Sequence, residues 1–384
     1  MIHWQKSAFQ NISSKSINLI SLVLSFALYG VIILYFKVDK PDLELHIGFS
    51  EKMIADGKFL VHPIFFILIQ VFSFFSHHYP AQLFAAFIIF AAAQYFKIAI
   101  SLKILKEHFG MEYTPILFLG VLALQVVIPI PFFSEYFMVN SLSMNYFHNG
   151  TLNISIPFCL ALLLNLIRYL KTEERRFFLR SILFAILICL SKPSFLFCFA
   201  PVFPFVVLFK DGISRKLLAM VQLSTIIIFI IILQSVFLKS STSSAVNFEV
   251  KFQPFYLFGS IANHCRIFIE GFLIGVLLLF FYLKKIVADT IILSSLLFVF
   301  LGYIISFFFV DYIDGVTSPN FVWQSSIVNY IFVLLGMGYI IPTKSFKQIN
   351  FYSAVCIVAL STHAICGLLY LKSACILRIF YLSM

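Results

Sequence analysis

The feature that most constrains this chain is a series of apolar windows, each about twenty residues long and free of charge. Windows of that length can cross a hydrocarbon core of roughly 30 Å as α-helices. Hydrophobic residues make up 61% of the chain and charged residues only 11%, whereas soluble domains are about half apolar and a quarter charged. The sequence therefore predicts an all-α, polytopic integral membrane protein that forms a single transmembrane domain over residues 1–384.

The distribution of Lys and Arg predicts which apolar runs cross. If residues 59–77 crossed, the basic stretch at 168–180 would fall outside, against the positive-inside rule. If they lie in the outer interface instead, seventeen of the 27 Lys and Arg residues are cytoplasmic, Lys97 among them. We therefore expect juxtamembrane helices in an outer loop at 37–80 and the remaining bundle at 81–371. The eleven predicted spans are 17–36, 81–102, 114–132, 152–168, 178–191, 194–209, 217–238, 267–283, 289–309, 326–342 and 351–371.

Charge and cysteine content exclude other classes of protein. The net charge of +11 could suggest nucleic acid, but cytoplasmic loops that hold a topology explain it, so no nucleic-acid partner is expected. Lys6 and Lys15 precede the first span and place the N-terminus in the cytoplasm. The seven cysteines lie mostly in apolar runs without CxxC or Cys/His metal spacing, as buried thiols do.

The first outer loop holds a dense group of acidic residues just outside the membrane. Asp42 and His46 would stand one turn apart on one face of a helix, with Glu44 pointing elsewhere. A carboxylate beside an imidazole can act as a general base with its orienting partner, or bind a divalent metal. The alternative is a solvated loop with a local ion pair.

Polar residues also gather where the fourth span begins. His148 and Asn149 precede Gly150 and Thr151, and their donors could bind a sugar or a phosphate near a helix N-terminus. The alternative is an ordinary helix cap, for which Asn, Gly and Thr are common.

Lys192 joins two apolar runs with almost no loop between them. A lysine at membrane depth is expensive and is a functional candidate, with a lipid-linked phosphate or a carboxylate such as Asp42 as its partner. The alternative is a lysine that snorkels at a helix end.

In a later outer loop, Arg266 could also bind a phosphate. The spans themselves carry almost no charge, which disfavours an ion-coupled transporter.

The order of these motifs resembles the GT-C superfamily of membrane glycosyltransferases. The first outer loop, with Asp42, His46 and the pair His62-Pro63 before a run that does not cross, is similar to theirs. The segment from His148 to Thr151 looks like a His-Asn-Pro-Thr element of a bacterial GT-C-like group, although Gly150 stands where that group has Pro. Residues 191–195 are similar to its Lys-Pro-Ser element. The resemblance covers roughly residues 17–200.

This resemblance implies an inverting enzyme of the bacterial inner membrane. It would transfer a sugar from a polyprenyl-phosphate donor to a cell-surface glycan or glycolipid acceptor on the outer face, in contact with membrane lipids. Catalysis would fall to Asp42, Glu44 and His46, with Asp42 as the base. Lys192, Arg266, His148 and Asn149 would bind substrate. The resemblance implies no particular cofactor, although a divalent metal could bind at Asp42.

Three other functions fit parts of the sequence. An O-antigen-type polymerase or ligase also has about a dozen spans, but usually relies on several outer arginines, and only Arg266 precedes the tail here. A lipid-linked sugar flippase would work without Asp42. A non-catalytic assembly subunit is the third.

Overall fold

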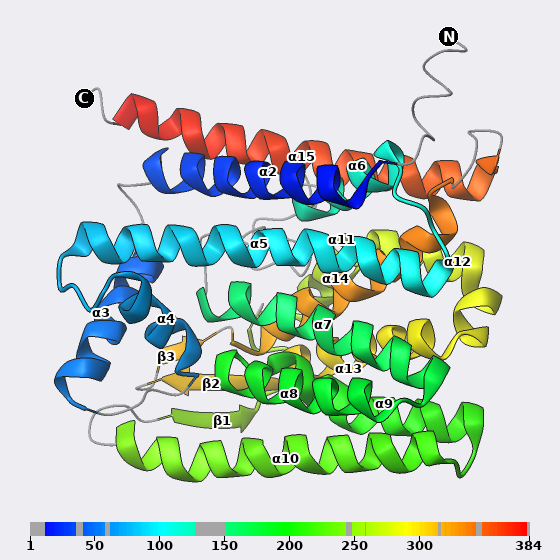
Figure 1. Ribbon diagram of the computed structural model, residues 1–384, viewed down its shortest axis with the longest axis horizontal. Coiled ribbons are helices and arrows are strands. Elements are labelled where there is room, and N and C mark those ends of the chain that lie inside the picture. Colours follow the sequence, from blue (N-terminus) through cyan, green and yellow to red (C-terminus); the bar gives the residue numbers. More distant parts are fainter. Residues whose placement is uncertain are drawn as a thin grey trace.

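The structure is a computed structural model that describes residues 12–35, 41–57, 62–126, 150–242, 248–257, 259–313, 316–318, 320–342 and 348–381. Most helices lie side by side along the long axis of the molecule (Figure 1). Two short helices and a small sheet gather at one end of this bundle, at the left of Figure 1.

The helices follow the apolar segments, and each of the eleven predicted spans coincides with one helix or a bent pair. Pro80 opens α5, and Gly110 ends it in the left-handed conformation that favours glycine. The helices are α2 (Ser14–Tyr35), α3 (Pro41–Ala55), α4 (Ile64–Phe72), α5 (Tyr79–Phe109), α6 (Pro115–Val126), α7 (Gly150–Thr172), α8 (Arg175–Ser191), α9 (Ser194–Asp211), α10 (Arg215–Thr242), α11 (Ile261–Gly271), α12 (Leu273–Ala288), α13 (Thr290–Phe308), α14 (Asn320–Ile340) and α15 (Phe351–Tyr381).

Six of these helices are long and apolar enough to cross a membrane, and α11 with α12 makes a seventh if the pair is one span. The four remaining predicted spans lie in α2, α6, α8 and α14, whose described apolar stretches are shorter. The chain is thus an all-α, multi-pass membrane protein. Its most enclosed helix is α7, which is 94% buried across its apolar window and packs against α5 and α8.

One predicted span is not straight. The run expected at 267–283 bends by 67° between α11 and α12. Phe272 lies at the break and its ring is fully buried. A side chain on Gly275 would overlap that ring, so glycine leaves the space into which Phe272 folds back on α12.

The segment at 59–77, which the charge pattern predicts not to cross, contains the short helix α4. Helix α4 has nine residues, about 14 Å of helix, which is too short for a hydrocarbon core of roughly 30 Å. It packs with α3 against α5 at the same end as the sheet. A separate apolar cluster, which includes Ile47, Phe65, Phe66 and Phe90, holds this platform together.

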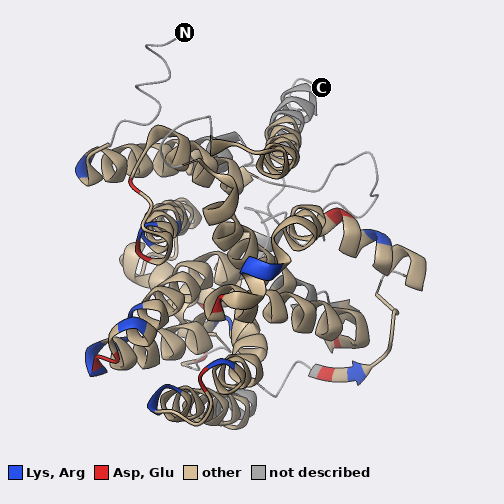
Figure 2. Ribbon diagram, turned by 90° about the vertical axis from the view of Figure 1, so that its right-hand side faces the viewer, with Lys and Arg blue, Asp and Glu red and all other residues tan. Residues whose placement is uncertain are grey.

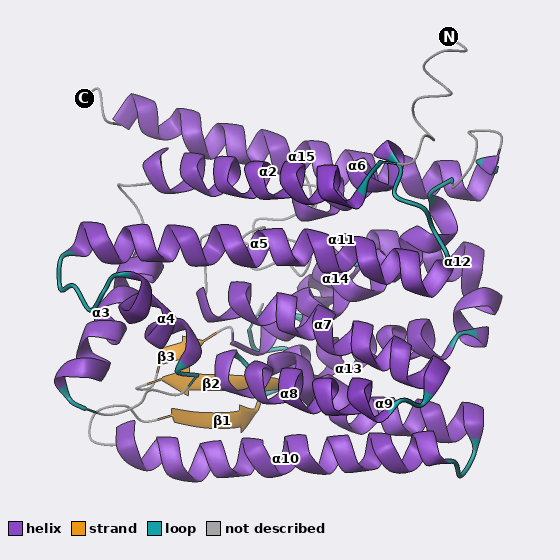
Figure 3. Ribbon diagram, viewed as in Figure 1, coloured by secondary structure: helices purple, strands orange, loops and turns teal. Residues whose placement is uncertain are grey.

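The small sheet is a feature that the sequence did not predict (Figure 3). Strand β1 (Phe248–Phe252) pairs antiparallel with β2 (Phe309–Ile313), which pairs antiparallel with β3 (Val316–Ser318). The strands come from two predicted outer loops, 239–266 and 310–325. Because hydrogen bonds join them, these two loops lie at one end of the bundle, as the predicted alternation requires.

Lys97 corrects the prediction that the spans carry almost no charge. It was counted as cytoplasmic, yet it is only 3% exposed and lies twelve residues before the end of α5 at Phe109, about 18 Å along the helix. Its Nζ has no hydrogen-bond partner among the residues that the structure describes, and it lies 4.4 Å from the centre of the Tyr330 ring. The Tyr330 hydroxyl is bonded instead to Ser101 at 2.8 Å and to Gln125 at 3.0 Å. The sequence places Lys97 near the end of a predicted span, but it does not show whether the amine reaches the membrane surface or is buried.

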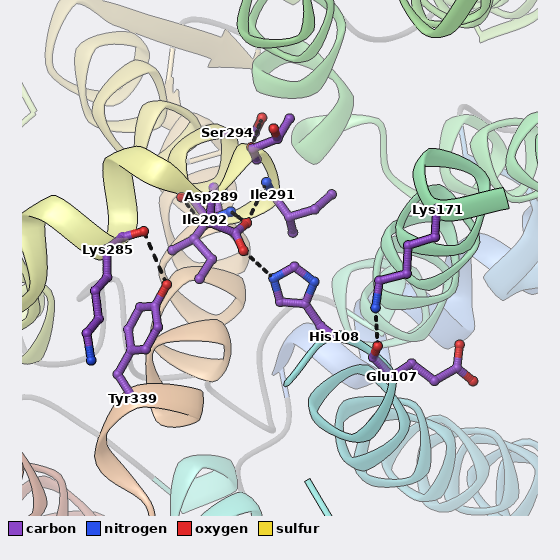
Figure 4. Close-up of polar contacts among 11 residues, drawn as sticks. Glu107, His108, Lys171, Lys285, Asp289, Ile291, Ile292, Ser294 and Tyr339 are labelled. Atoms are coloured by element: carbon purple, nitrogen blue, oxygen red, sulfur yellow. Dashed lines mark hydrogen bonds and ion pairs between the residues drawn. The ribbon is translucent and has the colours of Figure 1, made fainter. Parts of the chain in front are cut away.

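The opposite end of the bundle, the predicted cytoplasmic end, is joined by ion pairs. Arg168 of α7 donates from Nε to Glu107 of α5 at 2.6 Å. His108 contacts Asp289 at 2.8 Å, and Asp289 caps α13 by accepting from two backbone N–H groups (Figure 4). Figure 2 looks onto this end and shows acidic and basic segments at several helix ends. These contacts tie α5 to α7 and α13.

Candidate functional site

The predicted helix around Asp42 is present. Asp42 is the second residue of α3, one turn before His46, and its side chain lies outside the described part of the structure. Glu44 is exposed and accepts a hydrogen bond from the Tyr79 hydroxyl at 3.3 Å, which links α3 to the start of α5.

His46 lies among aromatic rings. Its ring centre is 5.7 Å from that of Phe65, 5.8 Å from that of Phe66 and 6.2 Å from that of Phe49. The imidazole therefore packs in the apolar cluster between α3 and α4, and it orients the two helices on each other. Its part in catalysis stays a prediction.

The start of α7 lies directly against this platform. His148 and Asn149 are outside the described residues, but the next residue, Gly150, is buried beneath the Phe65 ring. A Cβ on Gly150 would lie 2.5 Å from that ring, closer than real contacts allow. Close packing of α4 on α7 thus explains glycine where the similar group has proline.

Lys192 forms the sharp turn between α8 and α9, and it is only 6% exposed. Its backbone N–H donates to Ile188 at 2.8 Å, and its carbonyl accepts from the Ser155 hydroxyl of α7 at 3.1 Å. Pro193 is the N-cap residue of α9, which begins at Ser194. The turn therefore holds a buried lysine at the end of the bundle where the platform lies.

The structure adds two residues that sequence reasoning left out of the site, His62 and Gln234. Gln234 of α10 donates from Nε2 to the Cys189 carbonyl of α8 at 3.1 Å, and the same nitrogen lies 3.3 Å from His62 Nδ1. His62 precedes α4 as part of the His-Pro pair, which was the available signal. Gln234 is one polar residue in an apolar helix, and nothing in the sequence links it to His62.

The electrostatics of this group favour a neutral imidazole. Burial, and then the positive charge of Lys192, lower the pKa of His62 to about 3. We call His62, Lys192 and Gln234 the outer cluster. It brings a buried lysine close enough to His62 for the charge of the lysine to disfavour the imidazolium.

Arg266 has a different setting. It lies on α11, its side chain is 49% exposed, and its Nε pairs with Glu270 one turn later at 2.8 Å. Among the described residues, no group of three or more His, Cys, Asp or Glu side chains could hold a metal. Asp42, the predicted metal ligand, lies outside that statement because its side chain is not described.

No protein-family model and no curated protein sequence matches the chain. Two solved structures are similar to it. ArnT from Cupriavidus metallidurans in the apo state aligns with a TM-score of 0.54 and 15% identity. The same protein bound to undecaprenyl phosphate aligns with a TM-score of 0.51 and 12% identity.

Each alignment covers 90% of this chain but 64% of ArnT, so the chain spans less than two thirds of the length of these structures. At this level of identity the likeness concerns the fold. Together with the apolar helices, it confirms the predicted architecture: the chain is an all-α, multi-pass membrane protein with the fold of ArnT.

Proposed function

We propose that this chain is a membrane glycosyltransferase of GT-C type. It takes a sugar from a polyprenyl-phosphate donor and transfers it to a glycan or glycolipid acceptor on the outer face of a bacterial inner membrane, with its N-terminus in the cytoplasm. The fold, shared with a protein that has been solved with undecaprenyl phosphate bound, supports a donor of this class.

The observation that carries the proposal is the buried Lys192 beside His62 at the platform end of the bundle. The Lys192 amine presents positive charge where an anion could be recognised. A lipid-linked phosphate supplies that anion, and its isoprenoid tail would lie among the apolar helices. We therefore assign Lys192 to the donor phosphate.

The reaction is a single displacement. The acceptor hydroxyl oxygen attacks the anomeric carbon, and the bond from that carbon to the phosphate oxygen breaks. The bonding electrons leave with the polyprenyl phosphate, and Asp42 takes the hydroxyl proton. One displacement inverts the anomeric configuration. Lys192 stabilises the charge that grows on the leaving phosphate.

The remaining predicted residues have supporting parts. Glu44 and His46 lie on the same helix as Asp42, and their contacts with Tyr79 and Phe65 hold that helix on the platform. His148 and Asn149 immediately precede Gly150 and would bind sugar or phosphate. A divalent metal at Asp42 would act as a Lewis acid on the leaving phosphate.

The alternatives are affected differently by the structure. An O-antigen-type polymerase or ligase would use outer arginines, and Arg266 is already paired with Glu270. A lipid-linked sugar flippase gains one supporting observation, because Lys97 is a charge-bearing group buried inside the bundle. Loss of function on changing Asp42 would separate an enzyme from a flippase.

The proposal predicts loss of transfer in two variants. Asp42→Asn removes the base, and Lys192→Ala removes the phosphate cation, so each should lower transfer at least about 100-fold. The measurement is release of undecaprenyl phosphate from a panel of undecaprenyl-phosphate hexoses in proteoliposomes, with extracted cell-surface glycolipids as acceptors.

Lys52→Ala is the matched control, because Lys52 is an exposed lysine on α3 at the same end. It should transfer sugar like the wild type. Wild-type rates in both Asp42→Asn and Lys192→Ala would remove the assigned roles. A wild-type protein that translocates the lipid-linked sugar without transferring it would favour the flippase.

A further inference from the structure

Three arginine side chains converge on one aromatic ring at the predicted cytoplasmic end of the bundle. The ring is that of Phe177, which is buried in the first turn of α8. The Cζ atom of Arg176 lies 4.7 Å from the centre of this ring, that of Arg168 5.5 Å and that of Arg180 6.0 Å. The face of an aromatic ring attracts cations at such distances. Because Arg168 belongs to α7, the ring gathers positive charge where α7 and α8 pack together.

Two of these three guanidinium groups have a carboxylate partner. Arg168 donates from Nε to Glu107 at 2.6 Å. Arg176 pairs through Nε with Glu174 at 2.7 Å. Arg180 is exposed, and no acidic side chain pairs with it among the residues that the structure describes. Within that part of the chain, one of the three positive charges therefore has no counter-charge.

The charges around Arg180 are also mostly positive. Residues 168–180 contain five Lys or Arg and two Glu, and Glu107 of α5 adds only a third carboxylate. Lys171 donates to the backbone carbonyl of Glu107, a neutral acceptor, and so keeps its full charge (Figure 4). The region therefore carries a surplus of positive charge, and arginine binds phosphate oxygens through parallel N–H donors.

The side of α8 that carries Arg180 also carries exposed apolar residues. Leu179 is 51% exposed and Leu183 is 52% exposed, and Leu183 lies about one turn deeper into the predicted span at 178–191. Arg180 is five residues after Arg175, the first residue of α8, which is about 8 Å along the helix. A phospholipid matches this order, because its phosphate lies at the membrane surface and its acyl chains lie deeper.

We propose that Arg180, held on the Phe177 ring, binds the phosphate of an anionic phospholipid in the predicted cytoplasmic leaflet, with the acyl chains along Leu179 and Leu183. A zwitterionic headgroup would place its own cation against the positive surplus of residues 168–180, so an anionic headgroup is preferred. The site lies at the end of the bundle opposite the outer cluster and does not depend on the proposed function.

Arg180→Gln tests this proposal in the purified full-length protein. Native mass spectrometry gives the apparent affinities for phosphatidylglycerol and for phosphatidylcholine of identical acyl chains. The wild type should bind phosphatidylglycerol more tightly than phosphatidylcholine. Arg180→Gln should lower the affinity for phosphatidylglycerol about tenfold, because a charge-assisted contact is lost, and should remove most of the preference. A wild-type preference in Arg180→Gln would overturn the proposal.

Arg175→Gln is the matched control. It removes the same charge from the same end of α8, and Arg175 is exposed and is not one of the arginines over the Phe177 ring. Its affinity for phosphatidylglycerol should stay within about twofold of wild type, because a charge with no fixed place on the site acts only through screened attraction. Equal losses in Arg175→Gln and Arg180→Gln would indicate general attraction to a basic end and would overturn the specific site.

Phe177→Leu tests the role of the ring, because it keeps every charge and removes only the aromatic face. The guanidinium groups would no longer be gathered in one place, so phosphatidylglycerol should bind about threefold more weakly. Wild-type affinity in this variant would overturn the positioning role of Phe177.

Inorganic phosphate distinguishes a lipid headgroup from a free anion. Added in excess over the lipid, it should not displace phosphatidylglycerol from the wild type, because it has no acyl chains to contact Leu179 and Leu183. Displacement at concentrations equal to those of the lipid would show that the site takes free phosphate and would overturn the assignment to a phospholipid.

Discussion

The two ends of the helix bundle treat charge in opposite ways. At the predicted cytoplasmic end, Arg168 meets Glu107, and His108 meets Asp289. At the platform end, Lys192 lies beside an imidazole whose positive form it opposes. The first arrangement shifts the pKa values of Glu107, Arg168 and Asp289 in favour of their ionised forms. The second disfavours the ionised form of His62.

The pKa shifts of two residues make the contrast concrete. Burial raises the pKa of Asp289, but the hydrogen bond and charge of His108, with two backbone N–H groups, outweigh burial and hold that pKa below its ordinary value. At His62, burial and the charge of Lys192 outweigh the hydrogen bond with the Cys189 carbonyl, and the pKa falls to about 3. Residues with strongly shifted pKa values are common at functional sites. We therefore propose that the first end has a structural role and that the second end has a functional role.

Replacing one charged residue at each end with methionine should give the largest effects. Lys192→Met should lower affinity for undecaprenyl phosphate about 100-fold, because it removes the cation assigned to the phosphate, and this loss should be larger than any change in thermal stability. Arg168→Met should do the reverse, with a loss of about 1–2 kcal/mol from the partly buried bidentate pair and near wild-type affinity per folded molecule.

Calorimetric unfolding and lipid binding on the same nanodisc preparations measure both quantities. If Arg168→Met lost affinity as strongly as Lys192→Met, the division between a structural and a functional end would fail.

Lys97 lies between the two ends. Its replacement tests whether this buried amine has a function. Methionine has a similar volume and needs no acceptor, so Lys97→Met should raise the free energy of unfolding by about 1 kcal/mol or more. Gln94→Met, a nearby buried polar residue on α5 whose amide donates to Gln125, is the control and should not stabilise. A less stable Lys97→Met protein would show that the amine has a partner that its contacts with Tyr330 do not reveal.

The smallest expected effect is a pH dependence at the cytoplasmic end. A depressed folded-state pKa means that Asp289 contributes stability above its unfolded pKa of about 3.9, and that this contribution is lost as pH falls through the folded value. Asp289→Asn should therefore be less stable than wild type by about 1 kcal/mol near pH 7, with the gap closing below about pH 4. A gap that is constant from neutral pH to pH 3 would contradict the ion pair.

The sequence predicted much of the fold because charge marks helix ends strongly. The turn at Lys192 was predicted between residues 191 and 194, which are the last residue of α8 and the first of α9. Juxtamembrane helices were predicted in the loop 37–80, and α3, which carries Asp42 and His46, is one of them. The nine-residue α4 followed from the positive-inside rule, because a crossing there would have reversed every later loop.

The parts that were not predicted depend on contacts distant in sequence. Strand β2 continues directly from the apolar helix α13, so hydrophobicity alone cannot separate the two. The tie between His62 and Gln234 joins residues 172 positions apart. Lys97 could have snorkelled, and only the packing of α14 and α6 against α5 shows that it does not.

A structure of the full chain in nanodiscs with undecaprenyl phosphate tests the central claim most directly. We expect the phosphate within hydrogen-bond distance of Lys192 Nζ, with the isoprenoid tail among the apolar helices. A phosphate seated on Arg266, or beside Lys97 within the bundle, would contradict the assignment of the outer cluster as the donor site.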